Sequence, residues 1–443
     1  MEEFIKALTE QMRCVKAREG VAKELMDHIQ DQTEAYEESG MSHEEALQAA
    51  VQEMGDPVAI GMELDHIHRP KTDWSMLWMV VIFSIAGIVL QYITGILDIG
   101  SGRLGNQLLY TMIGLAAMFG VYFLDYSFIG KYAKLVFWGM IILFTFMALF
   151  FVPRVNGLAK GLIMPAYLLV PAYAGILYQH RGQRYVGILK CILYMVPAAI
   201  FVSSVIGSFV MKLNILSIMC CMLLLAIWKG WFRLNRIKVI VSLLFVWVVF
   251  PSGVLTYMYY FMNDYRSFRL QSLFHILDGV SSLSTINVYA RDLILDSKWV
   301  GTAIDVADSN YQLMQLNGYI LTQLIAVYGI WLGVIVVFAF MILLSHMFRI
   351  TRKQKNQLGF MIGAGCGQIF AVMIIEGILV NVGRFPPTTM YIPFLNDGCS
   401  ATIVYDILIG LLLSIYRYQN VLSDKSFQPK WKLSLKLEKT MRN

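Results

Sequence analysis

Two apolar runs near the C-terminal end of the chain are joined by the segment Gly383–Ser400, which reads Gly-Arg-Phe-Pro-Pro-Thr-Thr-Met-Tyr-Ile-Pro-Phe-Leu-Asn-Asp-Gly-Cys-Ser. Its three prolines and sparse charge argue against a regular helix, because proline removes a backbone donor and blocks helix continuation. Irregular backbone at membrane depth is tolerated only where it lines a cavity or is buried in protein. The segment therefore predicts a bundle of membrane-spanning helices with a site at its outer mouth.

The composition agrees with a membrane protein. Of 443 residues, 57% are hydrophobic and 15% charged, and the mean hydropathy is +0.60. A soluble domain is about half apolar and about a quarter charged, so a soluble enzyme, a disordered chain and a fibrous protein are excluded. A spanning helix needs about 20 apolar residues. We therefore predict an all-α polytopic membrane protein of about ten transmembrane helices, from apolar runs near 75–96, 108–125, 134–152, 162–179, 185–207, 213–229, 236–262, 318–347, 358–380 and 400–416.

Charge divides the chain into an acidic head and a basic remainder. Residues 1–72 hold 16 acidic and 7 basic side chains, and the rest hold 29 basic and 14 acidic ones. The bases lie in alternate short loops, as the positive-inside rule requires, so we expect the head and the basic tail, 418–443, to be cytoplasmic. Bases in loops between spans do not indicate a nucleic-acid partner. The polar head has no cleavable signal segment, so internal spans are expected to insert the chain.

The six cysteines form no C-x-x-C pair, so neither a disulfide framework nor a metal site is predicted.

Residues 1–70 read as a small cytoplasmic helical domain. We expect a helix from about Val21 to Glu38, and a further helix that starts with the capping box Ser42-x-x-Glu45. Asp56 followed by Pro57 predicts another helix start. The strings Glu24–Gln32, Gly40–Ala46 and Met54–Pro57 resemble the permease prefix (HAAS-like) domain, which implies a regulatory or protein-contact role.

Two further features predict where polar chemistry could occur. The outward loop at about 264–317 is long and charged, and long loops of this kind are usually functional. Glu376 and Asp406 fall within apolar runs, where acids face the bundle interior. They would either line a path or form hydrogen bonds between helices.

The C-terminal third resembles the signature of the SEDS family (shape, elongation, division and sporulation proteins, such as FtsW, RodA and SpoVE). The resemblance rests on Pro386-Pro387-Thr388, Pro393-Phe394, Gly398-Cys399-Ser400 and Gly410–Ile415, with weaker agreement at Asn156-Gly157, Arg269-Leu270, Trp299–Gly301 and Tyr319–Thr322. It covers essentially all of residues 75–417 of the transmembrane domain, 71–417, and is weak in the first six spans.

The resemblance implies peptidoglycan assembly in a bacterial plasma membrane during cell growth, division or sporulation. The family polymerises glycan strands from a lipid-linked disaccharide-peptide precursor at the outer face. Such chemistry needs a carboxylate base and cations for the pyrophosphate. Arg269 and Arg384 would then bind pyrophosphate, and the outer cavity would be shaped by Pro386, Thr388, Pro393, Phe394, Gly398 and Ser400. A divalent cation, Mg²⁺ or Mn²⁺, would assist catalysis, and a class B penicillin-binding protein (transpeptidase) would be a partner.

One departure from the family pattern concerns catalysis. The family's essential acid is replaced by Gly318 in Asn317-Gly318-Tyr319-Ile320, and glycine cannot act as a base. Asp305 and Asp308 are the nearest substitutes. Three readings stay open: a polymerase that uses another acid, a non-catalytic scaffold or regulator of a cell-wall synthase, and a flippase or transporter of the lipid-linked precursor.

Overall fold

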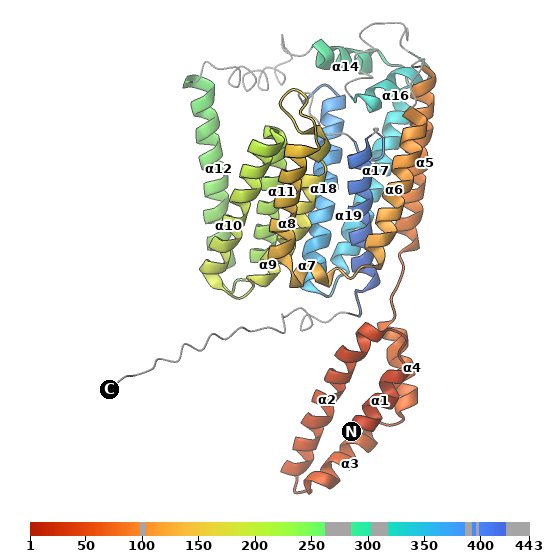
Figure 1. Cartoon of the computed structure of the whole chain (residues 1–443), viewed down its shortest axis with the longest axis vertical. Helices are drawn as coiled ribbons and strands as arrows, with labels where there is room; N and C mark the ends of the chain where they lie inside the picture. The colour runs from red at the N-terminus through yellow and green to blue at the C-terminus, as the bar shows by residue number, and fades with distance from the viewer. Residues whose placement is uncertain (98–102, 262–284, 303–317, 386–391, 396–397, 422–443) are drawn as a thin grey trace, which may run out of the picture.

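The computed structural model describes residues 1–97, 103–261, 285–302, 318–385, 392–395 and 398–421. Within these ranges every regular element is a helix, and the one β-bridge joins Val155 to Leu158. A long helical bundle carries a smaller helical unit, the head, at one end (Figure 1). We call this the head end of the bundle and the opposite one the far end. The predicted all-α class is confirmed.

The head contains four helices, α1 (Glu2–Glu10), α2 (Val15–Glu38), α3 (His43–Glu53) and α4 (Pro57–His68). The capping box at the start of α3 forms as predicted. The second helix begins at Val15, six residues before the predicted start, because its first turn packs Ala17 into the core. Local capping chemistry therefore sets the starts of α3 and α4, whereas packing sets the start of α2.

We expect Asp56→Ala to destabilise α4 by about 1 kcal/mol, because the Asp56 carboxylate accepts hydrogen bonds from the amides of Val58 and Ala59. Amide hydrogen exchange of α4 in the full chain measures this. Asp56→Asn is the matched control, since asparagine caps equally well. Equal protection in the alanine variant and the wild type would contradict the capping role.

Helices of the bundle cover the ten predicted apolar runs, although some of the runs are divided into several elements. Eight helical segments in the described part are long and apolar enough to cross a membrane, and α5 and α12 cover the remaining two runs. The elements in chain order are α5 (Trp74–Leu97), α6 (Arg103–Phe123), α7 (Ser127–Lys131), α8 (Ala133–Phe150), η1 (Lys160–Leu162), η2 (Pro165–Leu168), α9 (Leu169–Gln179), α10 (Arg184–Ile200), η3 (Phe201–Ile206), α11 (Phe209–Trp228), α12 (Arg236–Phe261), α14 (Thr285–Asp296), α16 (Ile320–Tyr328), α17 (Ile330–Arg352), α18 (Gln357–Asn381) and α19 (Cys399–Arg417).

The predicted run 318–347 differs from the structure, because it forms two helices instead of one. α16 ends before Gly329, which has φ +105°, and α17 begins after it. A Cβ at Gly329 would overlap the carbonyl oxygen of Trp299. Only glycine fits this combination of positive φ and close approach.

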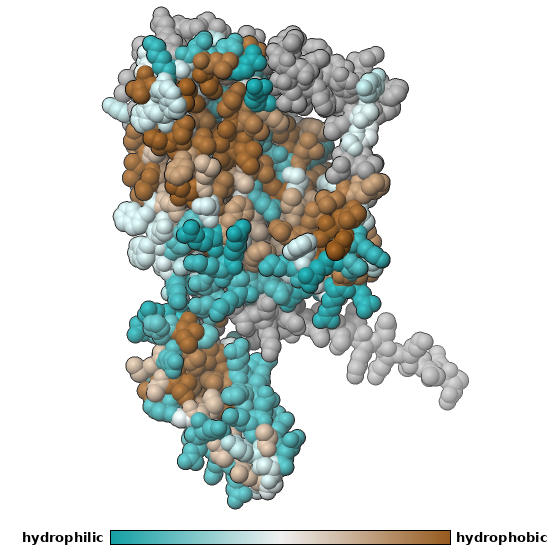
Figure 2. Space-filling model, turned by 180° about the vertical axis from the view of Figure 1, so that it is seen from behind, coloured by the Kyte–Doolittle hydropathy of each residue, from teal (hydrophilic) through white to brown (hydrophobic). Residues whose placement is uncertain are grey.

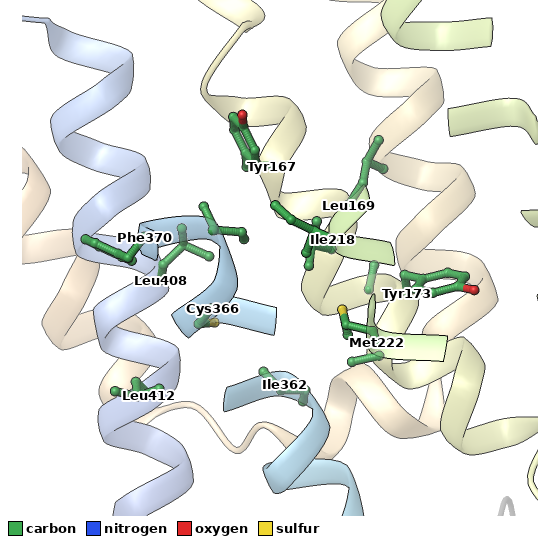
Figure 3. Close-up of a cluster of buried hydrophobic side chains, with 14 of the residues drawn as sticks. Tyr167, Leu169, Tyr173, Ile218, Met222, Ile362, Cys366, Phe370, Leu408 and Leu412 are labelled. Carbon is green, nitrogen blue, oxygen red and sulfur yellow. The ribbon is translucent and has the colours of Figure 1, made fainter. Parts of the chain in front are cut away.

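The core of the bundle is formed by α9, α11, α18 and α19. Figure 3 shows side chains from these helices and from η2 meeting in its interior, with Tyr167, Leu169, Tyr173, Ile218, Met222, Ile362, Cys366, Phe370, Leu408 and Leu412 labelled. The peripheral helices instead expose apolar side chains, among them Leu135, Ile142 and Leu149 of α8. Figure 2 shows a broad hydrophobic band around the bundle on the face opposite to that of Figure 1, the surface expected of a protein in lipid.

The head is attached to the bundle by several contacts at the head end. The Lys71 amide donates to the carbonyl oxygen of Arg417, and the Thr72 and Tyr122 hydroxyls lie 2.7 Å apart. His346 Nε2 lies 3.1 Å from a carboxylate oxygen of Asp73. A cavity of about 270 Å³ lies in the same seam, and its lining includes Gly20, Glu24, His68, Lys355, Asn356 and Asn420. The connector after α4 is therefore fixed to α6, α17 and α19.

Candidate functional site at the far end

A cap of two short helices lies over the far end of the bundle, where α14 and α16 meet α18 (Figure 1). Ala290 and Leu293 of α14 pack with Tyr319 and Val380 in a small apolar cluster separate from the main core. The polar groups of the candidate site are arranged around this cluster.

Asn287 joins α14 to the two chain segments beside it. The Tyr319 hydroxyl donates to Asn287 Oδ1, and Asn287 Nδ2 donates to the carbonyl oxygen of Phe385 at 3.1 Å. Both side chains are buried. Burial raises the pKa of Tyr319, so the phenol stays protonated and remains a donor. This network fixes the first residues of the segment Gly383–Ser400.

Asn381, the last residue of α18, caps the start of α16. Its Oδ1 accepts hydrogen bonds from the amides of Leu321 and Thr322 at 3.0 and 3.2 Å. Its Nδ2 donates to the carbonyl oxygen of Gly377 at 2.8 Å, and the Thr322 hydroxyl donates to its backbone oxygen at 2.5 Å. Asn381 is only 2% exposed, so these bonds are shielded from competing water.

Arg291 of α14 lies beside Gly383, the residue before Arg384, where α18 leaves the bundle, and we call Arg291 and Arg384 the arginine pair. Gly383 has φ +70°, and a Cβ there would overlap the Asn287 carbonyl oxygen and lie 3.2 Å from Arg291 Cβ. The next residue, Arg384, is exposed, and Arg291 Nε lies 3.5 Å from Asp292 Oδ1. Guanidinium groups suit phosphate and pyrophosphate, which they can bind in a bidentate manner.

Residues 392–395 lie inside the bundle. Phe394 is buried, and its ring centroid lies 5.7 Å from Phe83, 6.4 Å from Phe370 and 5.9 Å from Tyr405. A Cβ at Gly87 of α5 would overlap the Phe394 carbonyl oxygen. This non-helical segment is thus enclosed by protein, as irregular backbone at membrane depth must be.

A polar cluster also lies in the bundle interior. Asn214 Nδ2 of α11 donates to Glu376 Oε2 of α18 at 2.6 Å and lies 3.4 Å from the Tyr167 hydroxyl. Of the two roles considered for Glu376, a hydrogen bond between helices is therefore observed.

The structure places some of the predicted site residues at the far end. Gly318, with φ +78°, directly precedes Tyr319, and Arg384 lies beside α14. Pro393 and Phe394 are buried deeper, and Gly398 and Ser400 are half-buried at the start of α19. The remaining predicted site residues lie outside the described part of the chain, namely Arg269, Asp305, Asp308, Pro386 and Thr388.

Four residues of the site were not selected from the sequence: Asn287, Arg291, Tyr319 and Asn381. For Asn381 a local signal existed, since Asn-Val-Gly follows an apolar run as helix-ending sequences do. Among the described residues no group of three or more metal-ligating side chains occurs.

Comparison with known proteins gives one sequence relative. No model of a known protein family matches the chain. The probable peptidoglycan glycosyltransferase FtsW of Trichlorobacter lovleyi is 30% identical over 86 residues. The match covers 19% of this chain and spans less than a quarter, 23%, of that relative.

Comparison with solved structures gives a match over most of the chain. A chain of a peptidoglycan synthase complex, described for its structural coordination of polymerization and crosslinking, superposes with a TM-score of 0.59 at 17% identity. That match covers 79% of this chain and 99% of the other. Thermus thermophilus RodA, a rod shape determining protein, matches with a TM-score of 0.52 at 15% identity, over 79% and 97% of the two chains. The chain therefore has a RodA-like fold and a short stretch of sequence similar to FtsW.

Proposed function

We propose that this chain is a SEDS protein of a bacterial plasma membrane that acts in peptidoglycan assembly by binding the lipid-linked disaccharide-peptide precursor. The observation that carries the proposal is the RodA-like fold, which extends over 79% of the chain. The arginine pair at the far end supports the proposal, because the precursor carries an anionic pyrophosphate that guanidinium groups bind well.

The proposal includes an orientation. The loops at the head end carry the excess of lysine and arginine, so the head, residues 1–70, and the tail, 418–443, face the cytoplasm. The transmembrane domain, 71–417, then presents α14 and α16 to the outside. A precursor with its polyprenyl tail in the outer leaflet would reach the far end directly.

Site roles follow from this orientation. Arg384, together with Arg269 from the outward loop, binds the pyrophosphate, and Arg291 is added because it lies beside Gly383. Pro386, Thr388, Gly398 and Ser400 shape the entrance, and Pro393 and Phe394 hold the entrance segment from beneath.

The geometry favours precursor binding without catalysis. Gly318 occupies the position of the family's acid, and its positive φ suits glycine better than a residue with a side chain. A non-catalytic scaffold would act through a partner, for which a class B penicillin-binding protein is our candidate. The second candidate is a polymerase that uses Asp305 or Asp308 as base with Mg²⁺ or Mn²⁺. This candidate is favoured by the similar fold of a chain from a peptidoglycan synthase complex, whose description refers to polymerization.

The test uses the purified full chain in lipid nanodiscs with a fluorescent lipid-linked precursor and Mg²⁺ or Mn²⁺. We expect wild type to bind precursor and form no polymer. Arg384→Ala should weaken binding about tenfold or more, since hydrogen bonds to charged groups contribute about 1.5–3 kcal/mol. Arg154→Ala, at another exposed far-end arginine, is the matched control and should bind as wild type does.

The outcomes separate the candidates. Polymer formed by wild type would refute the scaffold and make Asp305→Asn and Asp308→Asn the next variants. Polymer formed only by Gly318→Asp would identify glycine as the cause of inactivity. Absence of precursor binding by wild type would refute both candidates.

A further inference from the structure

Asp406 lies in the interior of the bundle, on the face of α19 that packs against α6. It is 1% exposed, and neither carboxylate oxygen has a hydrogen-bond partner among the described residues. A Cβ at Gly114 of α6 would overlap Asp406 Oδ2. The carboxylate therefore points at Gly114, which leaves room for it because glycine has no side chain.

Three of the titratable groups on the elements that pack against α19 have partners other than Asp406. Glu376 of α18 accepts from Asn214, which also lies beside Tyr167 of η2. His346 of α17 pairs with Asp73, and Tyr122 of α6 bonds to Thr72. The other titratable groups on these elements are Arg103 and Tyr110 of α6, Cys366 of α18, Cys399, Tyr405, Tyr416 and Arg417 of α19, and Arg349 and Arg352 in the last turn of α17. Of these, Tyr405 donates towards the sulfur of Met164.

An ionised carboxylate with no donor and no counter-charge is very costly in a low-dielectric interior. Acids inside spans are for this reason rare and usually functional. We propose that Asp406 is a binding site for a monovalent cation, either a proton or Na⁺, and that loading of this site keeps α6 and α19 packed. The site is separate from the arginine pair, and the inference does not depend on the proposed function.

A polar path connects the site with the far end. Gln107, Thr111 and Gly114 follow each other on one face of α6, as i, i+4 and i+7 positions do. Gln107 is buried, and its Oε1 has no hydrogen-bond partner in the described part of the chain. The methyl group of Thr402, one turn before Asp406, would lie 3.4 Å from a Cβ at Gly114, and the Thr402 hydroxyl donates to the Gly398 carbonyl oxygen. A cation entering along this face of α6 would therefore meet the oxygens of Gln107 and Thr111 before it reaches Asp406.

The first experiment treats the full chain in nanodiscs with dicyclohexylcarbodiimide, an apolar reagent that reacts with protonated buried carboxyl groups, and maps the products by mass spectrometry. We expect modification of Asp406, and its loss in Asp406→Asn. Protection by NaCl relative to choline chloride identifies Na⁺ as the ligand, and equal labelling in both salts identifies the proton. Gly114→Ala, which fills the space before the carboxylate, should lose the modification. Gly120→Ala, on the same helix with open space around it, should keep it.

A second measurement tests the proposal without requiring that the reagent reach Asp406. The thermal stability of wild type is compared with that of Asp406→Asn over a range of pH and of Na⁺ concentration. If Asp406 binds a cation, the thermal stability of wild type should change with pH or with Na⁺ concentration in a way that the stability of Asp406→Asn does not. Superimposable dependences in the two proteins, together with an unmodified Asp406 in either salt, would overturn the proposal.

Discussion

Gly87→Ala is expected to destabilise the protein by about 3 kcal/mol and to abolish precursor binding at the far end. The added methyl would overlap the Phe394 carbonyl oxygen, and a backbone atom cannot rotate away as a side-chain end can. Overpacking in a closed core costs about 1–3 kcal/mol, and the upper end applies here. The overlap can be relieved only if residues 392–395 move away from α5, and this movement would separate the Phe394 ring from those of Phe83 and Tyr405.

The measurement is thermal unfolding in nanodiscs combined with binding of fluorescent precursor. Gly139→Ala is the matched control, because α8 has open space around Gly139. It should be as stable as wild type or slightly more so, since alanine favours the helix. If Gly87→Ala unfolds at the wild-type temperature and binds precursor normally, residues 392–395 do not depend on this contact.

Sequence patterns predicted the elements whose determinants are local. Hydropathy placed the ten runs, because each span must be apolar over its own length. The caps at Ser42 and Asp56 were predicted for the same reason, since the capping side chain and the amides it accepts from are within three residues.

The remaining features depend on contacts between distant segments. The break at Gly329 is set by Trp299, thirty residues earlier, and an uninterrupted apolar run gives no sign of it. Asn287 bonds Phe385, and His346 bonds Asp73, across 98 and 273 residues. The sequence predicts that Glu376 and Asp406 both lie inside the bundle. Only the structure shows that Glu376 accepts a hydrogen bond from Asn214, whereas the Asp406 carboxylate has no hydrogen-bond partner among the described residues.

Asn381→Ala is expected to lower the unfolding free energy by about 2–4 kcal/mol and to loosen the cap over the far end. Alanine removes the acceptor of the Leu321 and Thr322 amides and the donor to the Gly377 carbonyl. An N-cap contributes about 0.5–2 kcal/mol, and each buried polar group left unsatisfied costs about 1–3 kcal/mol more. Hydrogen exchange should show early opening of α16.

The consequence for function follows from where Asn381 lies. It precedes Gly383 and Arg384, so loss of its bonds releases the turn that holds Arg384 beside α14, and precursor binding should weaken. Asn356→Ala is the matched control, because Asn356 caps the other end of α18 with equivalent bonds to Leu358 and Gly359. It should lose stability and retain precursor affinity. Equal weakening of precursor binding by both variants would mean that affinity follows global stability, and that the cap formed by Asn381 does not position the arginine pair.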